Sequence, residues 1–205
     1  MNMHRKTSFV LCTGLLFCAI FAFCTVAQAG SDVVLIKNYS PKFKADLSAY
    51  KDTRIYLMNF DNQARDTSMW SYFSPDKKFS YSGTSWIHNY FWYSFEKALI
   101  GLGMFVSNKD RPDPYAPAVW MTLKSVTDAR FEVEVNIQKY VYGTLLTKVY
   151  AVTGEDVKPE ERKLEYLEKR AYEMTDKLFE MILTDPEFKN AFLKSAAEMV
   201  QAQVK

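Results

Sequence analysis

The hydrophobic positions of this chain follow a period of two in its middle third. Apolar and polar side chains alternate strictly along residues 131–138, which is typical of a half-exposed β-strand. Compact apolar runs at 54–60 and 119–126 predict two further strands, and 145–152 predicts the antiparallel partner of 131–138. The sequence therefore predicts a sheet built mainly from neighbouring antiparallel strands.

In two longer segments the apolar residues recur every three or four positions instead. They place an apolar stripe on one face of a helix at 87–102 and at 159–183. Asp185-Pro186 ends the second helix and starts a shorter one. Because the strands cluster between the helices, we predict an α+β fold: a mostly antiparallel sheet with two main amphipathic helices packed on one face, plus a C-terminal helix.

Aromatic residues gather between the first predicted strand and the end of the first predicted helix. There are 11 aromatics among the 26 positions from Trp70 to Phe95, and those at 70–73 and 79–81 flank a Pro-Asp turn, which predicts a small hairpin. Two interpretations stay open: the connection at 61–83 folds back and buries these rings, or the rings form a surface for a protein, glycan or lipid partner. The residues that we assign to such a partner surface are Trp70, Tyr72, Phe73, Phe79, Tyr81, Trp86, Tyr90 and Tyr93.

The N-terminus carries the features of an export signal. A positive segment at 4–6 precedes the uncharged apolar run 9–26, and Ala27-Gln28-Ala29 gives the small-x-small pattern that a signal peptidase accepts. We expect cleavage after Ala29 and export to the bacterial periplasm. The alternative is a leader that is retained as an anchor, and only then do we expect association with a membrane.

We expect four parts along the chain. They are a signal peptide at 1–29, an extended N-terminal arm at 30–52, the α+β domain at 53–184 and the C-terminal helix at 185–205.

All three cysteines, Cys12, Cys18 and Cys24, lie in the leader. The mature chain therefore has no disulfide, no thiolate metal site and no cysteine nucleophile. Each cysteine follows a bulky Leu or Phe, whereas a lipoprotein cleavage site requires a small residue there, so an outer-membrane lipoprotein is the minor alternative. Removing the leader also leaves equal numbers of basic and acidic residues, which gives no electrostatic case for a nucleic-acid partner.

The mature chain has one histidine, His88, which lies on the first predicted helix at four-residue steps from Trp92 and Glu96. A histidine polarised by Glu96 would be a general base, and the alternative is an ordinary surface or half-buried residue. No second histidine, nucleophile elbow or phosphate-binding glycine loop accompanies it, and the acidic clusters lie where turns are expected. We expect no cofactor and no metal.

The order of these segments is similar to that of a known family. A strand ending in Phe60-Asp61, a helix closing with Ala98-Leu99, and then Gly103-Met104-Phe105-Val106 are followed by a Pro-rich loop, strands and a long helix. Over about residues 50–185 this pattern resembles the small periplasmic auxiliary-lipoprotein superfamily, which includes ABC-type transport auxiliary components and the N-terminal-type domain of curli-secretion lipoproteins. The resemblance implies a non-catalytic domain that assembles with envelope proteins, often as an oligomer.

The sequence thus favours a non-enzymatic, exported binding or assembly component of a bacterial envelope transport or secretion system. A periplasmic lipid- or glycan-binding module with an aromatic-lined groove is the first alternative. A hydrolase-like enzyme that uses His88 and Glu96 is the second.

Overall fold

The computed structural model of the chain describes residues 30–31, 39–82, 86–139 and 143–203. The chain divides into two units, Met1–Gly30 and Ser31–Lys205, and the fold below is that of the second unit. The predicted signal peptide and its cleavage site at Ala29 lie outside the described residues, as does the part of the N-terminal arm at 32–38. No described helix has the length and apolar character needed to cross a bilayer.

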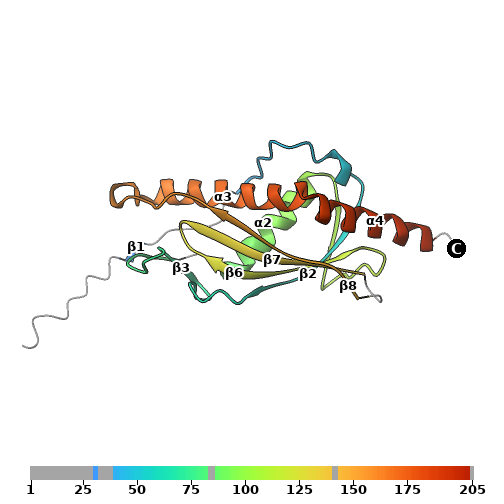
Figure 1. The fold of residues 1–205 in the computed structure, drawn as a ribbon, viewed down its shortest axis with the longest axis horizontal. Coiled ribbons are helices and arrows are strands. Elements are labelled where there is room, and N and C mark those ends of the chain that lie inside the picture. The colour runs from blue at the N-terminus through green and yellow to red at the C-terminus, as the bar shows by residue number, and fades with distance from the viewer. Residues whose placement is uncertain (1–29, 32–38, 83–85, 140–142, 204–205) are drawn as a thin grey trace, which may run out of the picture. The chain divides into compact units, whose positions relative to one another are not determined.

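A five-stranded sheet forms the centre of this unit (Figure 1), and its strand order is β5-β2-β6-β7-β8. Its strands are β2 (Arg54–Asn62), β5 (Phe105–Asn108), β6 (Ala118–Val126), β7 (Arg130–Lys139) and β8 (Gly143–Thr153). The two long ladders, β6–β7 and β7–β8, are antiparallel, as predicted. β2 runs parallel to both β5 and β6, a pairing that the local pattern did not predict.

Three helices cover one face of the sheet: α2 (Ile87–Gly101), α3 (Leu164–Thr184) and α4 (Pro186–Gln203). The α+β prediction with two main helices and a C-terminal helix is therefore confirmed. The long helix begins at Leu164 rather than at 159, because Pro159–Glu161 form a short 3₁₀ turn and Arg162 leaves helical geometry at ψ 51°.

The alternating pattern decides which side of the sheet faces the helices. On β7 the apolar positions Phe131, Val133, Val135 and Ile137 are all buried, while their polar neighbours are only partly covered. The helix stripes meet this face, and the rings of Phe95 on α2 and Phe179 on α3 lie 4.8 Å apart in the core. Burial of apolar surface between the two layers is the main stabilising contribution.

The N-terminal arm is docked onto the helical layer. Tyr39 is buried, and its hydroxyl donates to Asp176 at 2.8 Å, while the backbone N–H groups of Lys44 and Ala45 both donate to a Glu180 carboxylate oxygen. The Tyr50 hydroxyl donates to the Leu183 carbonyl at 2.7 Å. The segment 39–52 is therefore fixed against α3, and three of its backbone N–H groups, those of Lys42, Lys44 and Ala45, donate to carboxylates of this helix.

The predicted hairpin is present as β3 (Ser71–Phe73) and β4 (Ser80–Ser82), which pair antiparallel. Tyr72 lies opposite Tyr81, and both rings are buried against the main domain. The hairpin also forms a bridge from Phe73 to Thr127, next to the turn between β6 and β7.

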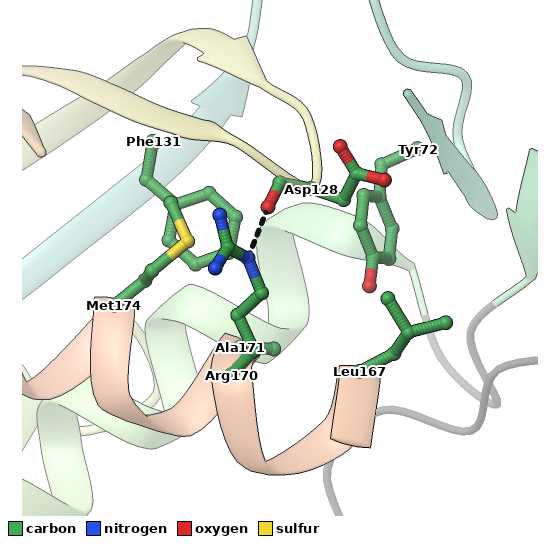
Figure 2. Close-up of a pocket in the computed structure, with 7 residues that line it drawn as sticks. All are labelled: Tyr72, Asp128, Phe131, Leu167, Arg170, Ala171 and Met174. Atoms are coloured by element: carbon green, nitrogen blue, oxygen red, sulfur yellow. Dashed lines mark hydrogen bonds between the residues drawn. The ribbon is translucent and has the colours of Figure 1, made fainter. Parts of the chain in front are cut away.

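A buried ion pair fixes this hairpin to the rest of the unit. The Asp128 carboxylate, 1% exposed, accepts from Arg162 Nη1 at 2.5 Å and from the Tyr81 hydroxyl at 2.6 Å. Arg170 Nε donates to the Asp128 carbonyl at 2.7 Å, as Figure 2 shows, and the Arg162 guanidinium stacks 4.0 Å from the centre of the Phe79 ring. We call Asp128, Arg162 and Tyr81 the Asp128 cluster; it joins the β6–β7 turn, the segment before α3 and the hairpin.

The Asp128 cluster gives a stability prediction. Arg162→Met removes the charge but keeps most of the stem, and it leaves a buried carboxylate without its cation, so we expect a loss of about 3–5 kcal/mol in the free energy of unfolding. The matched control is Arg130→Met, which removes the ion pair with Glu132 near the surface and should cost about 0–1 kcal/mol. Urea unfolding followed by circular dichroism measures both, and equal losses would contradict the assignment.

Candidate functional site

Two hollows meet beside His88, and together we call them the His88 groove. The first, of about 280 Å³, lies between the second half of β2 and α2, and its far end is formed by Trp92, Tyr93, Lys109 and Asp110. The second, of about 370 Å³, continues along the segment 60–69. Both hollows are lined by Phe60, Asp61 and His88, so the groove follows the end of β2 on either side of the histidine.

The local sequence explains how these residues converge. The register of β2 against β6 shifts between Leu57 and Phe60, an irregularity within the part of the strand that lines the groove. The first N–H of α2, that of Ile87, donates to the Met69 carbonyl at 2.9 Å and fixes the start of the helix against the connection. Since side chains four positions apart share a helix face, His88 and Trp92 enter the same hollow.

Exposed aromatic rings border the groove. Trp70, Trp86 and Tyr93 are 49%, 39% and 54% exposed. The Trp70 and Trp86 rings meet edge to face at 6.2 Å, and Trp86 lies 5.3 Å from the His88 ring. At the other end, Trp92 and Tyr93 meet edge to face at 5.0 Å. Trp92 and Tyr93 therefore line the first hollow, while Trp86 is connected to the groove by its contact with the His88 ring and Trp70 by its contact with Trp86.

The eight residues of the partner surface predicted from sequence differ in their exposure. Trp70, Trp86 and Tyr93 are exposed, while Phe73 and Phe79 are half-buried. The other three residues, Tyr72, Tyr81 and Tyr90, are buried, and placing them on a surface was wrong.

The burial of these three tyrosines has a physical cause. Tyr72 and Tyr81 share the inner face of the hairpin, and the Tyr81 hydroxyl is bonded to Asp128. The Tyr90 hydroxyl lies 2.6 Å from Thr175 Oγ1 on α3. The Tyr81 and Tyr90 phenols therefore have internal partners, and burial raises the pKa of Tyr72 and Tyr90 above the ordinary value for tyrosine.

Several lining residues escaped the sequence analysis. Asp61 and Asp110 were interpreted as turn residues, and Asn59, Asn89 and Lys109 were not singled out. Each lies at a strand end or on a helix flank, where polar residues are ordinary, and no local pattern brings them together. The parallel β2–β5 pairing places the end of β5, Asn108, beside Leu57 in the middle of β2, so that Lys109 and Asp110 follow next to the second half of β2.

His88 is the titratable group on which the electrostatics of the groove depend. Burial lowers the pKa of His88, and the negative charge of Asp61 acts in the opposite direction. Among the described residues His88 has no hydrogen-bond or ion-pair partner, and its ring contact is with Trp86. At neutral pH the groove thus holds a mainly neutral imidazole next to a carboxylate.

The predicted His88–Glu96 pair is not assembled in the groove. Glu96 lines neither of the two hollows, and the carboxylate that shares them with His88 is that of Asp61. Burial raises the pKa of Glu96 above its ordinary value. Among the described residues there is also no group of three side chains suited to hold a metal ion. The arrangement supplies hydrogen-bonding groups and aromatic faces, which suits binding.

No protein-family model matches the sequence, and no curated protein matches it. The comparison with solved structures gives similar folds at low sequence identity. One is protein XCC0632 from Xanthomonas campestris, of family DUF330, with 6% identity and a TM-score of 0.54 over 85% of this chain and 98% of that chain. Another, of an uncharacterized protein, has 9% identity and a TM-score of 0.49 over 75% of this chain and 97% of that chain. The chain therefore has the fold of an uncharacterized bacterial family.

The histidine gives a test of the groove's electrostatics. The pKa of His88 should lie below 6.5, so protonation of this group destabilises the fold as the pH falls below about 6.5. Asp61→Asn removes the opposing charge and should lower this pKa further, whereas Asp110→Asn should change it less. Nuclear magnetic resonance titration of the imidazole, with the signal identified by its loss in His88→Asn, measures this. A pKa above 6.5, or equal shifts in the two variants, would contradict it.

Proposed function

We propose that this chain is a non-enzymatic, exported binding or assembly component of a bacterial envelope transport or secretion system. The observation that carries the proposal is the exposure of three rings: Tyr93, which lines the His88 groove, Trp86, which contacts the His88 ring, and Trp70, which contacts Trp86. The leader pattern ending at Ala29 supports export to the periplasm, and the fold of a bacterial DUF330 protein is compatible with this setting. The resemblance to the periplasmic auxiliary-lipoprotein superfamily belongs to the same proposal.

The aromatic rim has the properties of a contact surface. Trp and Tyr supply large contact area with few rotatable bonds, and they are enriched among residues that dominate binding energy. Here the backbone that carries the rings is well fixed: the Ile87 N–H to Met69 carbonyl bond ties the Trp70 segment to the start of α2. A surface that is already ordered loses less conformational entropy when a partner binds.

The partner that we propose is a protein of the bacterial envelope. A second copy of this chain is one such partner. The described groove is not strongly charged, because Asp61 and Asp110 are accompanied by Lys109. Recognition would therefore depend on aromatic contact and hydrogen bonds more than on net charge. A groove of this composition favours a protein surface over nucleic acid.

Binding explains the groove better than catalysis does. A general base needs a group that orients its imidazole, and His88 has none among the described residues. Asp61 shares the hollows with His88 but makes no hydrogen bond to it. For these reasons a hydrolase that uses His88 and Glu96 remains the weaker proposal.

A photo-crosslinking experiment tests the partner surface. A photoreactive amino acid at Tyr93, in the full chain in its own bacterial envelope, should form a discrete crosslinked species, because this side chain is exposed at the groove. The matched control is Tyr115, an exposed tyrosine near the start of β2 at Arg54, away from the His88 groove.

The same assay measures the contribution of the rim. Trp70→Ala combined with Trp86→Ala should reduce the crosslink yield by at least about tenfold, which is the effect of losing one or two central aromatic contacts. Tyr115→Ala should leave the yield unchanged. Equal crosslinking from Tyr93 and Tyr115, or an undiminished yield in the folded double variant, would contradict the proposal.

A further inference from the structure

The first hollow of the His88 groove collects polar side chains that have no partner within the described part of the chain. No hydrogen bond or ion pair is formed there by the side chains of Asn59, Asp61, His88, Asn89, Lys109 and Asp110. The neighbouring Asp66, in contrast, is used within the fold, since it accepts from both Ser125 Oγ and the Val126 N–H. Six polar side chains without an internal partner, three of them half-buried (Asp61, His88 and Asn89), lie around this hollow and point to a polar ligand.

The second hollow differs in this respect. Its side-chain amide at Asn62 donates to the Ser68 carbonyl and accepts from the Ala64 N–H, and the Thr67 hydroxyl donates to the Ser71 carbonyl. These groups are already satisfied, so beyond Asp61 and His88, which it shares with the first hollow, the second hollow adds shape and the exposed Met69 side chain. Specific recognition is therefore expected in the first hollow, with the rest of a ligand extending into the second.

The chemistry of the first hollow discriminates between ligand classes. The hollow is lined by two carboxylates, those of Asp61 and Asp110, and by one ammonium group, that of Lys109. This excess of negative charge disfavours the binding of a phosphate or another anion. An acyl chain would desolvate all of these polar groups without replacing their hydrogen bonds. A neutral sugar ring satisfies both demands, because its hydroxyls pair with amides and carboxylates while its C–H face packs on an aromatic ring.

The aromatic residues of this hollow are placed for such stacking. Trp92 is half-buried and packs against the hydrophobic core, so its ring is held by the fold, and Tyr93 beside it is exposed. The combined size of the two hollows, about 280 Å³ and 370 Å³, falls within the range of small-ligand sites, roughly 300–1,000 Å³. The groove is open along its length, which suits a linear ligand.

We propose that the first hollow is a subsite for a neutral oligosaccharide. One sugar ring packs on Trp92 and Tyr93, and its hydroxyls donate to Asp61 and exchange hydrogen bonds with Asn89 and His88. The inference extends the proposed binding function by naming a second ligand for the same groove. It does not require the protein partner, so each can fail without the other.

The probes are two uncharged oligosaccharides, an N-acetylglucosamine tetramer and a glucose hexamer, titrated into the full-length folded chain to about 10 mM, the range of weak binding. Nuclear magnetic resonance should show saturable shifts of the Trp92 indole and the His88 imidazole with at least one of them. The Trp120 indole, on β6, should not shift. Inorganic phosphate and choline at equal concentration are the charged comparisons and should cause no saturable shift.

Matched variants connect the shifts to the hollow. Asn89→Leu should weaken the affinity for the oligosaccharide at least tenfold, while Asn190→Leu, the same change at an exposed position of α4, should leave it unchanged. Asp61→Asn keeps the shape of the side chain and should also weaken binding. Absence of a saturable shift with both sugars, saturation by phosphate or choline instead, or equal affinity in Asn89→Leu and Asn190→Leu would overturn the proposal.

Discussion

The Asp128 cluster is the constraint on which the positions of the peripheral segments depend. A carboxylate removed from water needs a cation and hydrogen-bond donors, and here they come from Arg162 and Tyr81, two residues far apart in the sequence. The hairpin, the β6–β7 turn and the segment before α3 must therefore meet at one point. Hydrophobic burial makes the unit compact, while this ion pair determines where the β3–β4 hairpin packs against it.

The segments that line the His88 groove are held in place by the Asp128 cluster and by the pairing of β2. The hairpin cannot move away from the domain without breaking the Tyr81–Asp128 bond, so the segment that includes Trp70 is held at one border of the groove. The Met69–Ile87 backbone bond ties the same segment to the start of α2, and the pairing of β2 within the sheet fixes the strand that forms the opposite side. The site is thus supported by backbone pairing and buried contacts rather than by contacts among the groove residues themselves.

Local patterns were sufficient to predict most secondary structure, because the period of each segment reports which face is buried. The alternation along 131–138 and the small hairpin were both predicted correctly. The long helix was predicted to start too early, because Arg162 is drawn to Asp128 by a contact that no local pattern contains. The groove residues could not be predicted as a set, since the parallel pairing of β2 with β5 brings Asp61 and Asp110 together only in three dimensions.

The parallel placement of β2 has a consequence for how the chain acquires its structure. β2 ends at Asn62, whereas its two neighbours begin at Phe105 and Ala118, so neither flank of this strand can pair until a long stretch of later sequence is present. Closing loops of that length carries an entropic cost before any ladder forms, and parallel non-local pairing is correspondingly slow. β2 can therefore enter the sheet only after the strands that begin at Phe105 and Ala118 have been synthesised.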